Sequence, residues 1–354
     1  MHLEQLLKLV LEKGASDLHI RPPHRPVLRI FGELVVQNDL PPVTDIEANQ
    51  LLDAMITPRQ EEIFSREKEL DLAYTAPDIG RFRVNVMRQR GRLSIAFRMI
   101  PLKVPTIDEL ELPQILKQLV MKERGLILVT GQTGTGKSTT LAAMINHLND
   151  HVKRNIITIE EPLEFIHENR KCIIAQRDVG SDTESFASAL VHAIRHDPDV
   201  LVVGELRDLP TITTAITAAE TGHLVLGTLH TYNAPQSIDR MIDIFPADQQ
   251  QQIRIQLSQI IEAVLSQTLV SRRKGGRIAA FEIMIATPAV RNLIRESKLY
   301  QLPSLIQLGF KEGMQSLDQA LANLVKRGIV THETASLHAA EVLQFEKWLK
   351  AKTY

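Results

Sequence analysis

The chain is poor in cysteine, in net charge and in long apolar segments, and each shortage excludes a class of protein. Its single cysteine, Cys172, excludes an internal disulfide and a zinc site built from several cysteines. Lys and Arg number 41 and Asp and Glu number 42, so no overall field attracts nucleic acid or a membrane. No segment approaches the ~18 consecutive apolar residues of a membrane span, and Met1 to Gln5 lacks the basic start of a signal peptide. We therefore expect a cytoplasmic protein that inserts into no membrane and binds no nucleic acid.

The length of 354 residues, with 44% hydrophobic and 23% charged residues, is typical of a soluble protein with two domains. Residues 1–100 combine helical patterns, one of which begins at a capping box at 44–47, with short β-rich segments and predict a smaller α+β domain on an antiparallel sheet. Two prolines in 101–106 predict a linker, and a second capping box at 106–109 predicts a helix directly behind it. Residues 107–354 predict an α/β domain with a largely parallel sheet, followed from about 287 to 354 by a helical tail.

The segment from Gly131 to Ser138 has the sequence GQTGTGKS, which matches the phosphate-binding pattern G-x-x-x-x-G-K-[ST]. An apolar run at 126–129 precedes it and a helical pattern at 139–148 follows it, as in a strand, a glycine turn and a helix. Such a loop turns successive backbone N–H groups toward phosphate oxygens, and the helix adds its positive end. The sequence therefore predicts binding of ATP together with Mg²⁺.

The expected nucleotide contacts come from one continuous segment. Lys137 would reach the terminal phosphates, and the hydroxyl of Ser138 would bind the Mg²⁺ ion. The full set of residues predicted to bind the cofactor is Gly131, Thr133, Gly134, Thr135, Gly136, Lys137, Ser138 and Thr139.

Carboxylates follow two further predicted strands, at 156–159 and 201–203. Glu160 and Glu161 come after the first of these strands and are candidates to support Mg²⁺, with Glu160 as the ligand. Glu205 follows the second strand, where a carboxylate can deprotonate the water that attacks the γ-phosphate. The alternative is that Glu205 only forms an ion pair with Arg207.

Two histidines flank the strand predicted at 224–227. His223 and His230 are candidates to hydrogen-bond the γ-phosphate, although a lone histidine is most often structural. Arg83 and Arg98 lie on predicted strands of the first domain and could stabilise phosphoryl charge from another domain or subunit. The alternative is that these arginines line a solvated sheet face.

Five spaced segments together resemble the secretion-superfamily hexameric ATPases and, within them, the type IV pilus retraction ATPases. They are similar to the Walker A loop, the Asp box, the atypical Walker B segment, the His box and the AIRNLIRE-type segment of that family, and they lie at 131–140, 157–165, 202–208, 219–231 and 289–296. Residues 15–19 and 80–85 also match, so the resemblance covers nearly the whole chain.

The resemblance implies a PAS-like first domain, a RecA-like ATPase domain and a homohexamer. It implies that Arg83 and Arg98 reach the nucleotide phosphates and that ATP turnover acts on an inner-membrane pilus platform protein, with related retraction ATPases as further partners. The protein would then be recruited to the inner-membrane base of the pilus machine. Two departures affect details: Glu161 stands where aspartate is usual, and Tyr232-Asn233 where Asn-Ser is usual.

Several alternatives share this core. An accessory retraction paralogue would carry every ATPase motif. A pilus or type II secretion assembly ATPase normally has an extra amino-terminal domain and a tetracysteine zinc site, which the early start of the first domain and the lone Cys172 disfavour. A nucleic-acid translocase is disfavoured by the balanced charge. A nucleotide-binding scaffold without hydrolysis would be indifferent to loss of Glu205.

Overall fold

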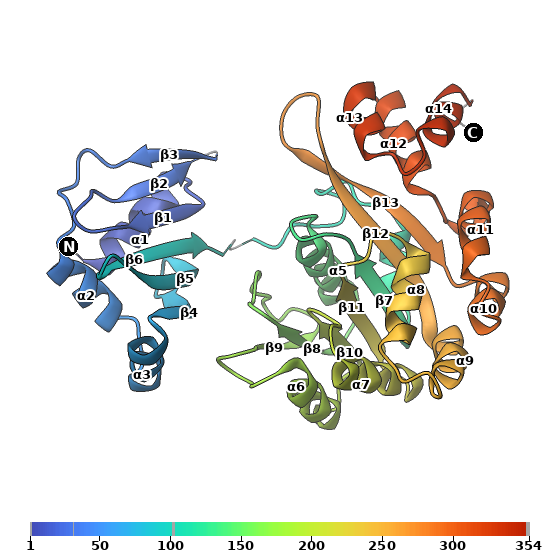
Figure 1. Ribbon diagram of the computed structural model, residues 1–354, viewed down its shortest axis with the longest axis horizontal. Helices are drawn as coiled ribbons and strands as arrows, with labels where there is room; N and C mark the ends of the chain where they lie inside the picture. The colour runs from blue at the N-terminus through green and yellow to red at the C-terminus, as the bar shows by residue number, and fades with distance from the viewer. Residues whose placement is uncertain (1, 31, 101–102, 352–354) are drawn as a thin grey trace. The chain divides into compact units, whose positions relative to one another are not determined.

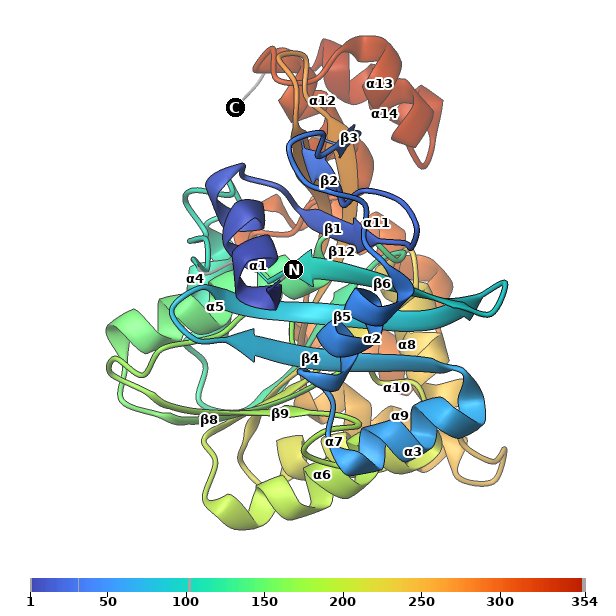
Figure 2. The same cartoon turned by 90° about the vertical axis from the view of Figure 1, so that its left-hand side faces the viewer.

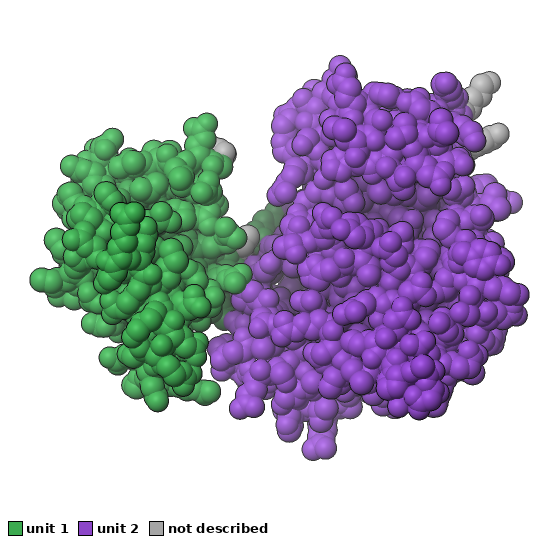
Figure 3. Space-filling view, viewed as in Figure 1, with its two compact units in different colours: residues 1–103 green, residues 104–354 purple. Residues whose placement is uncertain are grey.

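The structure, a computed structural model, describes residues 2–30, 32–100 and 103–351, which form two compact units. The first unit spans Met1–Lys103 and the second Val104–Tyr354 (Figures 1 and 3). Two residues of the predicted linker, 101 and 102, lie outside the described residues. Each unit has its own hydrophobic core.

The first unit is a six-stranded antiparallel sheet in the order β3-β2-β1-β6-β5-β4, and Figure 2 looks onto it. Apolar and polar residues alternate along its strands, so one face packs on helices and the other carries polar side chains. The strands are β1 (Asp17–Ile20), β2 (Val27–Ile30), β3 (Glu33–Val36), β4 (Glu69–Ala76), β5 (Gly80–Gln89) and β6 (Arg92–Met99). The helices are α1 (Leu3–Glu12), α2 (Asp45–Asp53) and α3 (Pro58–Glu67).

Capping boxes start two of these helices. Thr44 accepts a hydrogen bond from the backbone N–H of Glu47, whose carboxylate accepts one from the backbone N–H of Thr44. Thr57 and Gln60 form the same box at the start of α3, with Pro58 in the first turn. The sequence therefore signals α3 as clearly as α2, although only α2 was predicted from it.

The second unit is a seven-stranded sheet in the order β13-β12-β7-β11-β10-β8-β9 (Figure 1). All its strand pairs are parallel except β12 with β13, which confirms the predicted α/β class. The strands are β7 (Gly125–Thr130), β8 (Asn155–Glu160), β9 (Ile173–Asp178), β10 (Val200–Val203), β11 (Leu224–Leu229), β12 (Ile261–Ser271) and β13 (Arg277–Ile285).

Helices cover both faces of this sheet. One apolar cluster joins the sheet to α4 (Ile115–Val120) and α5 (Lys137–His151). A second cluster on the other face takes in α6 (Phe186–Ala193), α7 (Leu209–Glu220), α8 (Ala234–Asp243), α9 (Gln250–Ile260), α10 (Pro288–Arg295) and α11 (Leu302–Leu308). Because both faces are covered, β7 and β11 are buried along their whole length. Because β7, β8, β10 and β11 run parallel, their carboxyl ends meet at one edge of the sheet.

The tail after Pro288 is helical, as predicted. Its last three helices, α12 (Leu317–Lys326), α13 (His332–His338) and α14 (Val342–Lys350), pack with the far ends of β12 and β13 in a cluster of their own. No helix among the described residues is long and apolar enough to cross a membrane.

The helix predicted directly behind Thr106 is only one turn long. Thr106 and Glu109 do form the reciprocal hydrogen bonds of a capping box. Glu111 then adopts a left-handed conformation, with a φ of 53°, and ends the turn. The longer helix, α4, starts only at Ile115.

Gly227 in β11 generates a prediction about packing beneath the site. A Cβ atom at Gly227 would lie 2.5 Å from Cδ1 of Leu206, the residue after Glu205. We expect Gly227→Ala to lower the free energy of unfolding by about 1–3 kcal/mol through overpacking. Urea unfolding of both single variants and of the double variant with Leu206→Ala measures this effect. The clash predicts that Gly227→Ala costs clearly less in the Leu206→Ala background; equal costs in both backgrounds would show that Leu206 is not the cause.

Candidate active site

The phosphate loop joins the end of β7 to the start of α5. Gly131, Gly134 and Gly136 have φ values of 144°, 81° and 88°, which residues with a Cβ rarely adopt. Gly131 also needs space, because a Cβ there would lie 2.4 Å from the carbonyl oxygen of Gln267. The predicted strand, turn and helix are therefore present, and the glycines are required for the conformation of the loop.

The Lys137 side chain lies along this loop. Its Nζ donates to the carbonyl oxygens of Gly131 at 2.8 Å and of Gln132 at 3.0 Å. Burial lowers the pKa of Lys137, while the charges of Glu205 and Glu164 raise it. Phosphate oxygens are stronger acceptors than carbonyl oxygens, so this ammonium group is suited to exchange these partners for an anion.

Glu205 and His230 lie together at the carboxyl edge of the sheet. His230 Nε2 is 3.7 Å from Glu205 Oε1, and both side chains are partly exposed. Glu205 follows β10 and His230 follows β11, and these two strands are paired. The alternative was that Glu205 only forms an ion pair with Arg207. The structure does not show this pair, because Arg207 pairs with Glu161 instead, at 3.4 Å.

Glu160 and Glu161 have different surroundings although they are adjacent. Thr158 Oγ1 donates to Glu160 Oε1 at 2.7 Å, and Gln176 Nε2 lies 3.4 Å from the same oxygen. Burial raises the pKa of Glu160 to about 7 despite these bonds. Glu161 is exposed and holds its ion pair with Arg207.

The oxygen donors at the carboxyl edge of the sheet fit Mg²⁺ in number and kind. Among the described residues, no cluster of three or more His, Cys, Asp or Glu side chains could enclose a metal ion. Mg²⁺ needs no such cluster, because it usually takes one or two carboxylates with phosphate oxygens and water. The Glu160 carboxylate and the Ser138 hydroxyl supply a donor set of that size.

His223 is not brought to this edge. It precedes β11, and its carbonyl oxygen accepts from the backbone N–H of Gly125 at the start of β7. Its Nδ1 lies 2.9 Å from the carbonyl oxygen of Ala218 near the end of α7. The length of β11, about 20 Å at ~3.3 Å per residue, separates His223 from His230. Within this chain the structure thus gives His223 a place at the end of α7, away from the phosphate loop.

Arg83 and Arg98 are directly paired across β5 and β6 on the polar face of the first unit's sheet. Arg98 Nε donates to Asp17 Oδ1 at 2.8 Å, and Arg83 Nε lies 3.9 Å from Asp71 Oδ1. Both arginine side chains remain substantially exposed, at 70% and 47%. They form a pair of cationic groups on one face, each held by one carboxylate.

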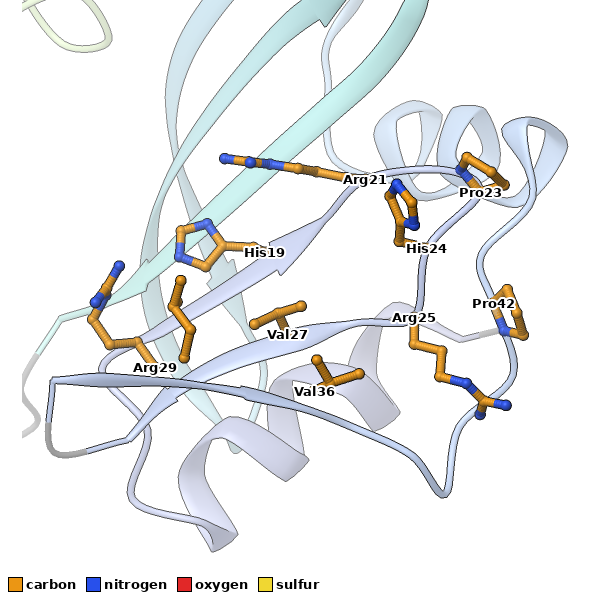
Figure 4. A pocket seen from close by; sticks show the side chains of 10 residues that line it. His19, Arg21, Pro23, His24, Arg25, Val27, Arg29, Val36 and Pro42 are labelled. Atoms are coloured by element: carbon orange, nitrogen blue, oxygen red, sulfur yellow. The ribbon is translucent and has the colours of Figure 1, made fainter.

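The same sheet face continues into a hollow of about 630 Å³ (Figure 4). His19, Val27 and Val36 are register partners across β1, β2 and β3 and line it. Arg21 and Arg29 line it as well, and their charges lower the pKa of His19 after the larger effect of burial. The polar face is therefore cationic beyond Arg83 and Arg98.

Helix α10 contains the segment at 289–296. Its Arg291 is anchored to the end of α9, where its guanidinium donates to the carbonyl oxygens of Ser258 at 2.9 Å and Gln259 at 2.7 Å. Arg291 also pairs with Glu262 at 2.7 Å, whereas Arg295 is exposed. Only Arg295 of these two arginines is thus free to present its charge at the surface.

Two glutamines lie at the site that were not predicted from the sequence. Gln267 contacts the phosphate loop from β12, and Gln176 on β9 accepts from the His167 N–H at 2.8 Å and donates to the Phe165 carbonyl at 2.9 Å. Neither stands at a strand end. The available signal was that a buried strand pattern continues through polar residues at 266–268, which a buried strand tolerates only when they are hydrogen-bonded.

Comparison with known proteins identifies the family of the chain. The family profile described as Type II/IV secretion system protein matches residues 1–337. The chain is 47% identical to the type IV pilus retractation ATPase PilT of Pseudomonas aeruginosa over 335 residues, covering 95% of this chain and 97% of that protein. It is 45% identical to a twitching motility protein of Neisseria gonorrhoeae, with 89% and 84% covered, and 41% identical to the type IV pilus ATPase PilU of P. aeruginosa, with 96% and 89% covered.

A solved structure resembles both units. It is a crystal structure of the pilus retraction motor PilT with bound ADP, with a TM-score of 0.92, 42% identity, and 98% of this chain and 99% of that chain covered. This likeness confirms the fold class predicted from the sequence. The chain therefore belongs to the type II/IV secretion system protein family and, within it, groups with the type IV pilus retraction ATPases.

Proposed function

We propose that this chain is the subunit of a homohexameric ring that hydrolyses ATP to power type IV pilus retraction. The observation that carries the proposal is the meeting of the phosphate loop, Glu205 and His230 at one sheet edge, in a chain with this identity to PilT. The ring would act at the inner-membrane base of the pilus machine, on a platform protein and together with related retraction ATPases.

Glu205 is the proposed general base. A carboxylate beyond the end of a buried strand can orient and deprotonate the water that attacks the γ-phosphate. His230, 3.7 Å away, is proposed to orient that carboxylate and to hydrogen-bond the γ-phosphate. Lys137 would exchange its bonds to the Gly131 and Gln132 carbonyls for bonds to phosphate oxygens. Bound Mg²⁺ neutralises phosphate charge, and Ser138 and Glu160 are the residues proposed to hold it.

The base of the nucleotide has a proposed location as well. A cavity of about 300 Å³ adjoins the start of α5 and is lined by Gly136, Thr139 and Thr140 on one side and by apolar residues that include Leu112 and Leu269. Apolar walls beside the phosphate loop suit a planar base. Thr139 thus contributes to the cofactor site from this cavity.

Arg83 and Arg98 are proposed to reach the phosphates from the first unit. The exposed pair of Arg83 with Asp71 is worth only ~0.2–1 kcal/mol, so its exchange for a phosphate costs little. Asp17 is buried, and Ser16 and Arg29 remain as its partners when Arg98 turns to a phosphate. Such an exchange would couple the nucleotide state to the position of the first unit.

Imaging of labelled pili tests the function. In cells of the source organism without this gene, pili should extend and fail to retract, and only the wild-type copy should restore retraction. Absence of all pili would instead identify an assembly motor. Unaltered retraction would fit the alternative of an accessory retraction paralogue.

Glu205→Gln should reduce ATP turnover by between about 100-fold and about 10,000-fold, because it removes a general base. Binding of a fluorescent ADP analogue should stay within about threefold of wild type, because the phosphate loop is intact. Steady-state hydrolysis and a binding titration measure the two effects. Glu333→Gln is the control, because it also removes one negative charge, at an exposed position on α13. Preserved turnover in folded Glu205→Gln would remove Glu205 from the role of base.

Glu160→Gln and Glu161→Gln separate the two adjacent carboxylates. We expect Glu160→Gln to raise the Mg²⁺ concentration for half-maximal hydrolysis by at least about tenfold, because it removes a proposed ligand. Glu161→Gln should change that concentration much less, because Glu161 pairs with Arg207. Mg²⁺ titrations of hydrolysis at saturating ATP compare them. The reverse order of effects would transfer the ligand role to Glu161.

A further inference from the structure

Strand β12 continues past the end of its neighbour β7. Thr130, the last residue of β7, is the register partner of Ser266, so the rest of β12 runs beside the phosphate loop. Gln267 is the first residue of this extension and is only 4% exposed. A buried amide side chain needs partners for both its donor and its acceptor.

Both ends of the Gln267 amide are used by the loop and the helix behind it. Its Nε2 donates to the carbonyl oxygen of Thr135 at 2.7 Å. Its Oε1 accepts from the hydroxyl of Thr140 at 2.7 Å, and Thr140 is 1% exposed in α5. One side chain thus connects the loop to the first turn of the helix.

The backbone of Gln267 also limits the loop. A Cβ built on Gly131 would lie 2.4 Å from the carbonyl oxygen of Gln267. A Cβ built on Gly136 would lie 3.1 Å from Nε2 of the same residue. The first and last glycines of the loop therefore pack against this single residue.

The bond to Thr135 determines where a neighbouring N–H points. In a planar trans peptide the C=O and N–H groups point in opposite directions. Because the Thr135 carbonyl is turned toward Gln267, the N–H of Gly136 is turned away from it. Phosphate-binding loops act through backbone N–H groups turned to one side, and this bond fixes one of them.

We propose that Gln267 is a positioning residue for nucleotide binding, which holds the phosphate loop in its binding conformation through Thr135 and Thr140. The inference rests on the proposed function and deepens it, because the ligand is the phosphate chain of ATP or ADP. Gln267 itself lies behind the loop and contributes affinity by ordering the loop before the nucleotide arrives.

Gln267→Glu tests this role at constant side-chain size. The change retains an acceptor for Thr140 and places a carboxylate oxygen against the Thr135 carbonyl, so the clamp on the loop is replaced by repulsion. The dissociation constant of a fluorescent ADP analogue with Mg²⁺, and the KM for ATP, should rise about 10- to 100-fold. The kcat should change by less than about threefold, because loop order contributes equally to ground state and transition state.

Gln315→Glu is the matched control. Gln315 Nε2 donates to the carbonyl oxygen of Phe281 at 3.1 Å, and Phe281 is the register partner of Gln267 on β13, so this bond lies one strand away from the clamp and does not involve the loop. This variant should lose thermal stability without losing nucleotide affinity. If Gln267→Glu binds the ADP analogue as wild type does, or if Gln315→Glu weakens binding equally, Gln267 has no positioning role.

The helix side of the clamp gives a second pair of variants in case Gln267→Glu does not fold. Thr140→Val removes the hydroxyl and should weaken nucleotide binding by about 3- to 10-fold. Thr140→Ser restores the hydroxyl and should recover most of the affinity. Equal affinity of the two variants would overturn the inference. Wild-type protein that binds no nucleotide would refute the proposed function itself, whereas normal wild-type binding with unaffected variants would refute only the role of Gln267.

Discussion

The conformation of the phosphate loop is the constraint on which the rest of the structure depends. Its glycines adopt positive φ values, so the loop has little conformational preference of its own and must be held by its surroundings. Strand β7 and helix α5 fix its two ends, and Gln267 on β12 contacts it from behind. The order of strands in the sheet therefore matters for function, because it places β12 beside β7 and extends β12 past the loop.

The environment of each carboxylate at this edge suits a different task. Glu160 is bonded to Thr158 and Gln176, and burial raises its pKa to about 7, so a bound cation would favour its ionised form. Glu161 is engaged by Arg207, and Glu205 is left beside His230, partly exposed, where a water molecule can reach it. The proposed division of roles among three similar side chains thus follows from what each one touches. In the first unit, Arg83 has an exposed carboxylate partner that is weak enough to be exchanged, whereas the partner of Arg98 is the buried Asp17.

The sequence predicted the features that depend on local pattern. The phosphate loop, four of the parallel strands, helix α2 and the helical tail from Pro288 all have signals within a few residues. The positions of the other site residues depend on pairing between strands that are far apart in the sequence. His223 and His230 flank one strand and look equivalent in sequence, yet strand direction places them at opposite edges of the sheet. Gln267 is 136 residues from Gly131, and only the pairing of β12 with β7 brings the two together. In α10, Arg291 and Arg295 are four residues apart and look equivalent in sequence, but Arg291 is anchored to the end of α9.

The central claim is that a single nucleotide site joins the phosphate loop to the carboxyl ends of β8, β10 and β11. Hydrogen–deuterium exchange of the wild-type protein with and without ADP and Mg²⁺ tests it most directly, because bound phosphates protect the backbone N–H groups that they contact. The account predicts protection of residues 131–140, together with 160–164, 204–207 and 228–231 and the part of β12 beside the loop. Protection confined to other segments, or no protection at saturating ADP, would contradict it.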